Sequence, residues 1–157
     1  MPRSLILGAL LALAAGAASA ATLELRATLN GANVVSSTDS PATGEARATL
    51  DDDNRLRLTL VFGGTTSEVT GVALHVGDSS ANGPIAETLD TGREQDGRRR
   101  VEQTLTLEDS VAARMRAGET YLEVTTADHP GGAIRGQLQP QPVRLRDMPA
   151  EPEEETP

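Results

Sequence analysis

Residues 121–138 read YLEVTTADHPGGAIRGQL, and this stretch decides the fold. Two segments of alternating apolar and polar side chains flank a short Pro-Gly-Gly turn, so the two strands must pair antiparallel. Matching their alternation predicts that Glu123 lies opposite Arg135. The same register sets Tyr121 opposite Gln137. The stretch therefore predicts a β-hairpin whose second strand carries a single charge.

The same alternation recurs along most of the chain. Hairpin turns are predicted at residues 51–54, which are acidic, and at Asp96-Gly97. Besides the closing hairpin, the predicted strands are residues 22–29, 44–50, 55–62, 69–76, 84–89 and 99–105. About eight short strands at this spacing predict an all-β domain, a β-sandwich with Greek-key connections.

One segment breaks this pattern and predicts a short crossover helix. Thr106 and Asp109 have the spacing of a capping box, in which each side chain bonds free N–H groups at a helix start. Val111 and Met115 lie four residues apart on one face, and Gly118 can adopt the left-handed conformation that ends a helix. The helix is expected to carry the chain across to the closing hairpin.

Aromatic residues are nearly absent, since Phe62 and Tyr121 are the only two. The core must therefore be built from Leu, Val, Ile and Ala. This shortage argues against aromatic cages and base-stacking platforms.

The first twenty residues have the pattern of an export signal. Arg3 precedes an uncharged apolar run at residues 5–18, and Ala-Ser-Ala at residues 18–20 predicts cleavage between Ala20 and Ala21. The run is too short for a membrane span, which needs about 20 residues. A buried N-terminal helix is the competing interpretation. We expect an exported protein, periplasmic or secreted, without membrane insertion after the signal is removed.

Composition narrows the partners further. The chain has no cysteine, which excludes disulfides and a thioether-linked lipid anchor. Its net charge is −9, and all basic residues are arginine. The electrostatic field of this negative net charge repels nucleic acid and anionic lipid surfaces, so we expect a protein or cell-envelope component as partner.

The last part of the chain differs in composition. Residues 139–157 are rich in proline and then acidic, which predicts a disordered tail. A solubilising extension and an interaction motif are both compatible with it. Residues 21–138 remain as a single domain.

Four features of this domain resemble those of the CHRD family, which is named for its repeats in chordin and also occurs alone in many exported bacterial proteins. They are ATLNGANVV (27–35) with SPATGEA (40–46), ALHVG (73–77) with NGP (82–84), the capped helix ending in Ala117-Gly118, and HPGG (129–132) with IRGQL (134–138). The resemblance implies an immunoglobulin-like or superoxide-dismutase-like β-sandwich. In chordin, the module belongs to a growth-factor-binding extracellular protein.

The departures from the family concern metal ligands. Family members often have His-x-His where this chain has Ala73-Leu74-His75, and often a histidine in place of Thr125. Two histidines two residues apart share one face of a strand and could chelate copper or zinc. Here only His75 remains at these positions, and His129, the other histidine, lies in a turn. We therefore predict no metal and no cofactor.

The candidate binding residues are His75, Glu123, Thr125 and Arg135. The charged residues among them could line a polar patch that binds a ligand carboxylate or a partner chain. Alternatively, Glu123 and Arg135 form a cross-strand ion pair that fixes the register, worth about 0.2–1 kcal/mol. Gly136 would allow close approach of a neighbouring strand in either case.

Three other motifs are better explained by structure. Gly77-Asp78-Ser79 with Asp128-His129 fits no hydrolase arrangement of nucleophile and base. The acidic residues 51–53 lack the glycine and the terminal glutamate of a calcium-binding loop. Residues 98–100, three arginines, can protect a strand edge, with an anion site as the minor alternative.

The sequence thus predicts an exported, non-catalytic binding or structural module. The alternative is a copper- or zinc-binding, metal-dependent redox protein that uses His75 with carboxylates such as Asp78.

Overall fold

The computed structural model describes residues 22–142. The predicted export signal (residues 1–20), its cleavage site at Ala20 and Ala21, and residues 143–157 of the predicted tail lie outside this part. No helix among the described residues has the length and apolar character that crossing a membrane requires.

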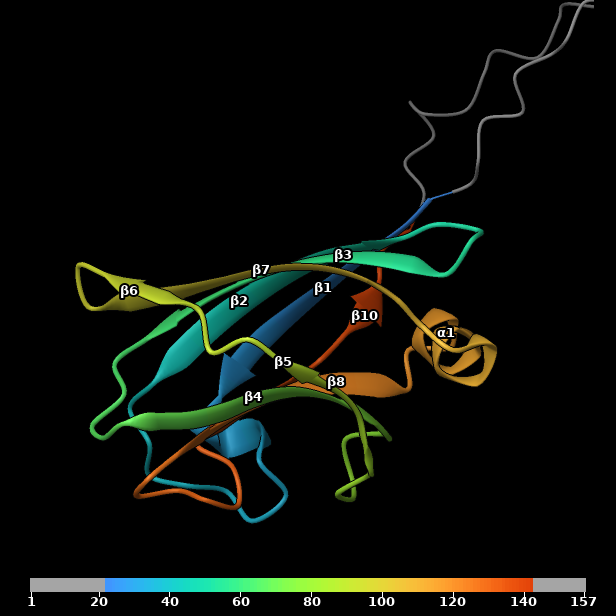
Figure 1. Ribbon diagram of the computed structural model, residues 1–157. Coiled ribbons are helices and arrows are strands. Elements are labelled where there is room, and N and C mark those ends of the chain that lie inside the picture. Colours follow the sequence, from blue (N-terminus) through green and yellow to red (C-terminus); the bar gives the residue numbers. More distant parts are fainter. Residues whose placement is uncertain (1–21, 143–157) are drawn as a thin grey trace, which may run out of the picture.

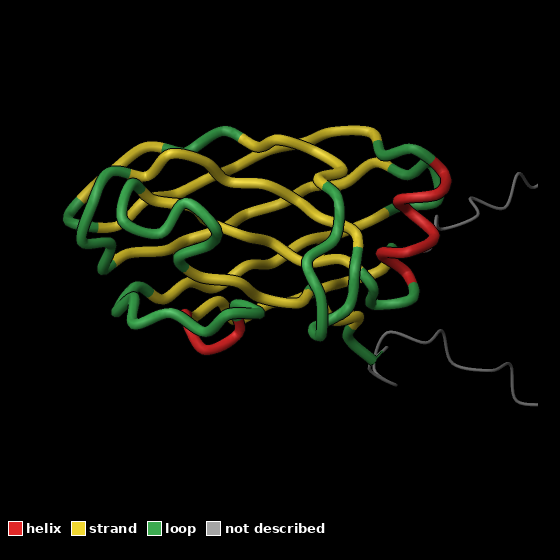
Figure 2. The backbone as a smooth tube through the Cα atoms, turned by 90° about the horizontal axis from the view of Figure 1, so that it is seen from below, coloured by secondary structure: helices red, strands yellow, loops and turns green. Residues whose placement is uncertain are grey.

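The described chain is mostly strand, with one α-helix and one turn of 3-10 helix (Figures 1 and 2). The elements are β1 (Leu23–Asn30), η1 (Gly31–Asn33), β2 (Thr43–Leu50), β3 (Arg55–Gly63), β4 (Val69–Val76), β5 (Ile85–Leu89), β6 (Arg93–Gln95), β7 (Arg98–Thr106), α1 (Asp109–Arg116), β8 (Thr120–Thr126), β9 (Ile134–Gln137) and β10 (Gln139–Pro140).

The strands form one antiparallel sheet in the order β5-β4-β8-β9-β1-β2-β3-β7-β6, with β10 beside β1. The sheet is strongly curled into a half-barrel, so that β4, β5 and β8 lie across from β1, β2, β3 and β7 (Figure 1). At the bend, β9 and β1 are joined by a single register pair, Asn30 with Arg135. The predicted antiparallel β-domain with one short helix is confirmed. The prediction of a β-sandwich implied two separate sheets, whereas the strands here connect into one continuous sheet.

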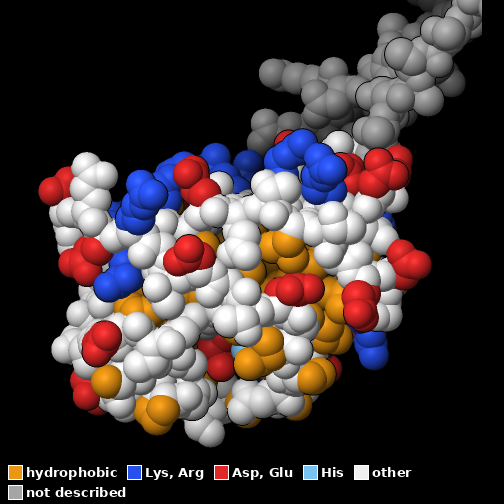
Figure 3. All heavy atoms as spheres, viewed as in Figure 1, with side chains coloured by type: hydrophobic (Ala, Val, Ile, Leu, Met, Phe, Trp, Pro, Cys, Tyr) orange, Lys and Arg blue, Asp and Glu red, His pale blue; other side chains and the backbone are white. Residues whose placement is uncertain are grey.

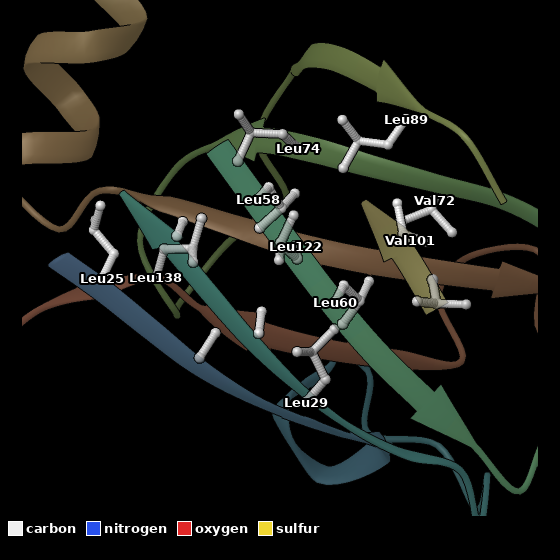
Figure 4. Packing of buried hydrophobic residues seen from close by; sticks show 14 of the residues in the cluster. Leu25, Leu29, Leu58, Leu60, Val72, Leu74, Leu89, Val101, Leu122 and Leu138 are labelled. Carbon is white, nitrogen blue, oxygen red and sulfur yellow. The ribbon is translucent and has the colours of Figure 1, made fainter. Parts of the chain in front are cut away.

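The concave side of this sheet encloses the core. Leu58 and Leu60 of β3 face Leu74 and Leu122 of the opposite strands across it (Figure 4). Val101, Leu107 and Met115 extend the same cluster, and Phe62 is its aromatic member. As the composition requires, small aliphatic side chains fill almost all of the interior.

The helix ends as predicted but begins differently. Gly118 has a φ of 75°, and its N–H donates to the Met115 carbonyl while that of Glu119 donates to Arg114, as in a Schellman motif. The predicted capping box is wrong, because Thr106 belongs to β7 and Glu108 precedes the helix without a side-chain cap. The Asp109 carboxylate instead accepts a hydrogen bond from Asn54 at 2.6 Å.

Two short strands were not predicted. β6 pairs with β7 through the Asp96-Gly97 turn, whose φ angles of 53° and 74° suit a tight hairpin. β10 lies within the region predicted as a tail: Gln139 pairs with Arg26, and the N–H of Gln141 donates to the Glu24 carbonyl at 2.8 Å. The ordered sheet thus continues past Leu138.

Gly136 is where β9 meets β1 most closely. A Cβ at this position would lie 2.6 Å from the carbonyl oxygen of Thr28 and 2.8 Å from Cγ of Leu29. Gly131, only a few residues away, differs, since a Cβ there would meet no atom of residues 22–142 within 4 Å. Only the first glycine is required by packing.

We expect Gly136→Ala to lower the free energy of unfolding by about 1–3 kcal/mol, because β9 and β1 must separate to admit the methyl group. Urea denaturation followed by circular dichroism measures this. Gly131→Ala is the matched control and should change stability by less than about 0.5 kcal/mol. Equal stability of the two variants would show that the contact between β9 and β1 does not limit the fold.

Candidate functional site

The second strand from the bend, β8, is buried on both faces. Leu122 and Val124 face the core, while Tyr121 and Glu123 point to the opposite side and are still only 0% and 8% exposed. The loop of residues 77–84, between β4 and β5, contributes much of this cover through contacts with β8 and β9. The convex side of the curled sheet therefore carries a buried polar cluster at this place.

Tyr121 lies at the centre of this cluster. The ring of His75, on β4, stacks on the Tyr121 ring with centroids 4.7 Å apart and planes inclined by 12°. The guanidinium carbon of Arg135, on β9, lies 3.4 Å from the centroid of the same ring. The two strands that flank β8 thus each place a side chain on one aromatic ring, and the guanidinium gains a cation–π contact.

Arg135 binds the loop rather than the neighbouring carboxylate. Its guanidinium donates to the side-chain oxygen of Asn82 at 3.2 Å, to the carbonyl of Ala81 at 3.1 Å and to the carbonyl of Asp78. The predicted register, with Glu123 opposite Arg135, is confirmed. The ion pair expected across it does not form, because the guanidinium binds the loop carbonyls and the Tyr121 ring, while the Glu123 carboxylate lies 4.0 Å from Nε2 of His75.

Gly83 closes the loop over the cluster. Its N–H donates to the Tyr121 hydroxyl at 2.9 Å, and its carbonyl accepts a hydrogen bond from Nδ1 of His75 at 3.0 Å. A carbonyl can only accept, so Nδ1 carries the proton. A Cβ at Gly83 would lie 1.7 Å from the Val76 carbonyl oxygen, which leaves glycine as the residue that fits.

Gln137 ties the cluster to the helix. Its side-chain amide donates to the carbonyls of Gly77 at 2.8 Å and Gly118 at 2.9 Å. The N–H of Gly77 also donates to the Glu119 carbonyl at 2.9 Å. The start of the loop is therefore fastened to the segment between α1 and β8.

Glu123 is the least satisfied member of the cluster. Its Oε1 lies 4.0 Å from Nε2 of His75, and its buried Oε2 has no hydrogen-bond partner in the described part of the chain. Burial raises the pKa of this carboxyl, and the nearby charges of His75 and Arg135 lower it by less than burial raises it. Burial therefore makes ionisation of this carboxyl less favourable than in water.

Three of the four predicted binding residues come together here, and Thr125 does not. Its hydroxyl lies near the Gly71 carbonyl, at 3.4 Å, and the hydroxyl of Thr70, at 3.1 Å, farther along β8. Asp78, the carboxylate considered as a metal ligand, accepts two hydrogen bonds from Ser80, which lower its pKa. Among residues 22–142, no group of three or more His, Cys, Asp or Glu side chains is arranged to hold a metal ion.

A groove of about 410 Å³ opens beside the cluster, between η1 with the residues after it and the loop. Val35, 42% exposed, and Ala32 give it an apolar side, and Ser79 and Ser80 give it a polar one. Arg135 lies at its base. The groove thus combines an apolar wall, hydroxyl groups and an underlying positive charge.

Sequence reasoning missed Tyr121 as the centre of the site. The signal was present, because Tyr121 is the only tyrosine and shares its face with both Glu123 and the register partner Gln137. Neither pattern says that a loop covers this face. The NGP motif at residues 82–84 was noticed only as a family feature, while its glycine is the residue that binds Tyr121 and His75.

The model of the CHRD domain matches residues 25–138, from β1 to the end of the closing hairpin. The chain belongs to the CHRD domain family. The match includes the residues that this CHRD domain uses for the buried cluster: His75, Tyr121, Glu123 and Arg135. No curated protein and no solved structure matches the chain significantly.

Glu123→Gln tests the electrostatics of the cluster. A raised pKa in the folded state means that the carboxyl contributes most to stability below its ordinary pKa of 4.5, and that this contribution is lost as pH rises through the folded value. The variant cannot ionise. We therefore expect its free energy of unfolding, relative to the wild type, to increase as the pH rises above about 4.5, measured by urea denaturation between pH 4 and 8.

Glu45→Gln is the control, because Glu45 is an exposed glutamate on β2. The difference in free energy of unfolding between Glu45→Gln and the wild type should not change between pH 4 and 8. A flat difference for Glu123→Gln as well would mean that burial does not govern the ionisation of Glu123.

Proposed function

We propose that this CHRD domain is an exported, non-catalytic module that binds a protein or a cell-envelope component. The groove between residues 32–35 and Ser79-Ser80 carries this proposal. One of its walls is a loop that Arg135, Tyr121 and His75 hold in place. A wall ordered before binding lowers the entropy cost of association, which is the property a binding surface needs.

The lining of the groove indicates the chemistry of the partner. Val35 offers exposed apolar surface, and Asn33, Ser79 and Ser80 offer hydrogen-bonding groups beside it. The Arg135 charge below favours a carboxylate or a carbonyl oxygen at the base. We infer an extended protein segment that places one apolar side chain against Val35 and an acceptor group near Arg135.

The partners of the polar side chains support a role without turnover. His75 and Arg135 direct their hydrogen bonds to backbone carbonyls of the loop, where they hold structure. The other histidine, His129, lies 3.0 Å from the Asp39 carboxylate.

Export and the finer fold assignment belong to the same proposal. The pattern of residues 1–20 supports a periplasmic or secreted location. The two facing halves of the curled sheet are compatible with a Greek-key sandwich of the immunoglobulin-like or superoxide-dismutase-like kind. The net charge of −9 argues against nucleic acid as the partner and against binding to anionic lipid.

A single introduced cysteine tests the groove, because the chain has no cysteine of its own. Ser79→Cys carries a photo-crosslinker at the groove wall, and the labelled protein is incubated with cell envelope from the source organism. We expect one dominant crosslinked product, at least about fivefold weaker when Val35→Asp is added, because a buried charge opposes apolar docking.

Gln95→Cys, on the exposed edge strand β6, is the matched control and should give no dominant product. Equal products from both positions, or a Ser79 product that Val35→Asp leaves unchanged, would contradict binding through the groove. Substrate turnover that Ser79→Ala abolished would contradict the non-catalytic role.

A further inference from the structure

The convex face of β1, β2 and β3 carries four exposed arginines, and three of them, Arg26, Arg47 and Arg57, line one depression on adjacent strands. Arg26 and Arg47 are direct register partners, and Arg57 pairs with Thr49, two residues along β2 from Arg47. All three side chains are exposed. Figure 3 shows basic side chains gathered along the side of the molecule that these strands form with β7. We call Arg26, Arg47 and Arg57 the arginine face.

The arginine face has no acidic partner within residues 22–142. Arg100, on β7 nearby, is ion-paired with Glu102 at 2.6 Å, whereas the side chains of Arg26, Arg47 and Arg57 make no hydrogen bond or ion pair with any described residue. Like charges directly opposite each other in a sheet repel and destabilise the pair. The three side chains line one depression of about 510 Å³. Glu24 and Glu102 line it too, and Glu102 is paired with Arg100, so the three arginines leave the depression with a surplus of positive charge in a chain whose net charge is −9.

The chain leaves the sheet next to this depression. In β10, Gln139 pairs with Arg26, and the N–H of Gln141 donates to the carbonyl of Glu24, which also lines the depression. From strand spacings, the backbone at residue 141 lies roughly 10 Å from Arg47. The last described residues, Gln141 and Pro142, therefore lie at the rim of the arginine face.

The following segment has the complementary charge. Residues 151–155 read EPEEE and contain four glutamates. Eight residues separate them from Pro142, and the nine residue steps reach up to about 30 Å when extended, which exceeds the distance to the arginine face. A segment tethered this closely has an effective concentration on the order of millimolar at its own face, far above that of a free anion.

We propose that residues 151–155 dock in the depression of the same molecule, with their glutamates on Arg26, Arg47 and Arg57. This goes beyond the proposed binding through the groove, which lies next to Arg135 and shares no lining residue with the depression. Docking relieves the repulsion between Arg26 and Arg47. It also keeps the arginine face from binding other acidic chains.

The absence of lysine allows a direct test on the full chain. Arg47→Lys keeps the charge and introduces the only side-chain amine, which a zero-length carbodiimide reagent can couple to a carboxylate in contact. We expect mass spectrometry to find an amide bond between residue 47 and a glutamate in residues 151–155. The yield should fall at least about fivefold in 0.5 M salt, which screens exposed ion pairs.

Arg98→Lys is the matched control, because Arg98 is also exposed on the sheet but lies roughly 25 Å from residue 141 by strand spacing. It should give less than about a fifth of the yield of Arg47→Lys, since only a nearly extended segment reaches it. Comparable yields from both positions, or coupling of residue 47 only to neighbouring sheet glutamates, would overturn the proposal. A yield that rises with protein concentration would assign the contact to a second copy and also overturn it.

Discussion

The guanidinium group of Arg135 lies inside the protein and has no carboxylate partner among residues 22–142, and the surrounding structure is arranged to satisfy it. The ring of Tyr121 covers it at 3.4 Å, and oxygens of Asp78, Ala81 and Asn82 accept its hydrogen bonds. An unsatisfied buried charge would cost several kcal/mol, so this arrangement cannot loosen cheaply. Through one side chain, the closing hairpin and the loop after β4 are held as a unit.

This constraint links the fold to the proposed function. β9 is the strand at the bend of the curled sheet, where Gly136 packs against the backbone of β1. The same strand carries Arg135 on its other face, directly below the groove. The close packing of β9 on β1 fixes the position of Arg135. Because Arg135 binds the loop of residues 77–84, it also fixes where this loop borders the groove. Glu123 remains in the cluster as an unsatisfied carboxyl, whose raised pKa reflects what burying it costs.

Patterns of period two predicted the strands and the closing register well, because each strand has a core face that only one register satisfies. The Asp96-Gly97 turn and the left-handed Gly118 followed from backbone chemistry that is local. The partner of Arg135 could not be predicted in this way. The guanidinium binds residues of the loop instead of Glu123, and these loop residues lie 53 to 57 positions away in sequence. The alternation of apolar and polar residues within a strand does not show which distant loop will cover it. β10 was missed because proline-rich composition hides a strand that pairs with β1 through only two residues.

Hydrogen exchange at the amide of Gly83 tests the central claim, that the Arg135 cluster holds the loop. This N–H lies in an eight-residue loop between β4 and β5, yet it donates to the Tyr121 hydroxyl. We expect the amide of Gly83 to exchange as slowly as the amides of β8, and at least about tenfold faster in Arg135→Lys, because lysine cannot reproduce the planar set of donors. Exchange of Gly83 as fast as at the exposed residues of the same loop, in the wild-type protein, would contradict it.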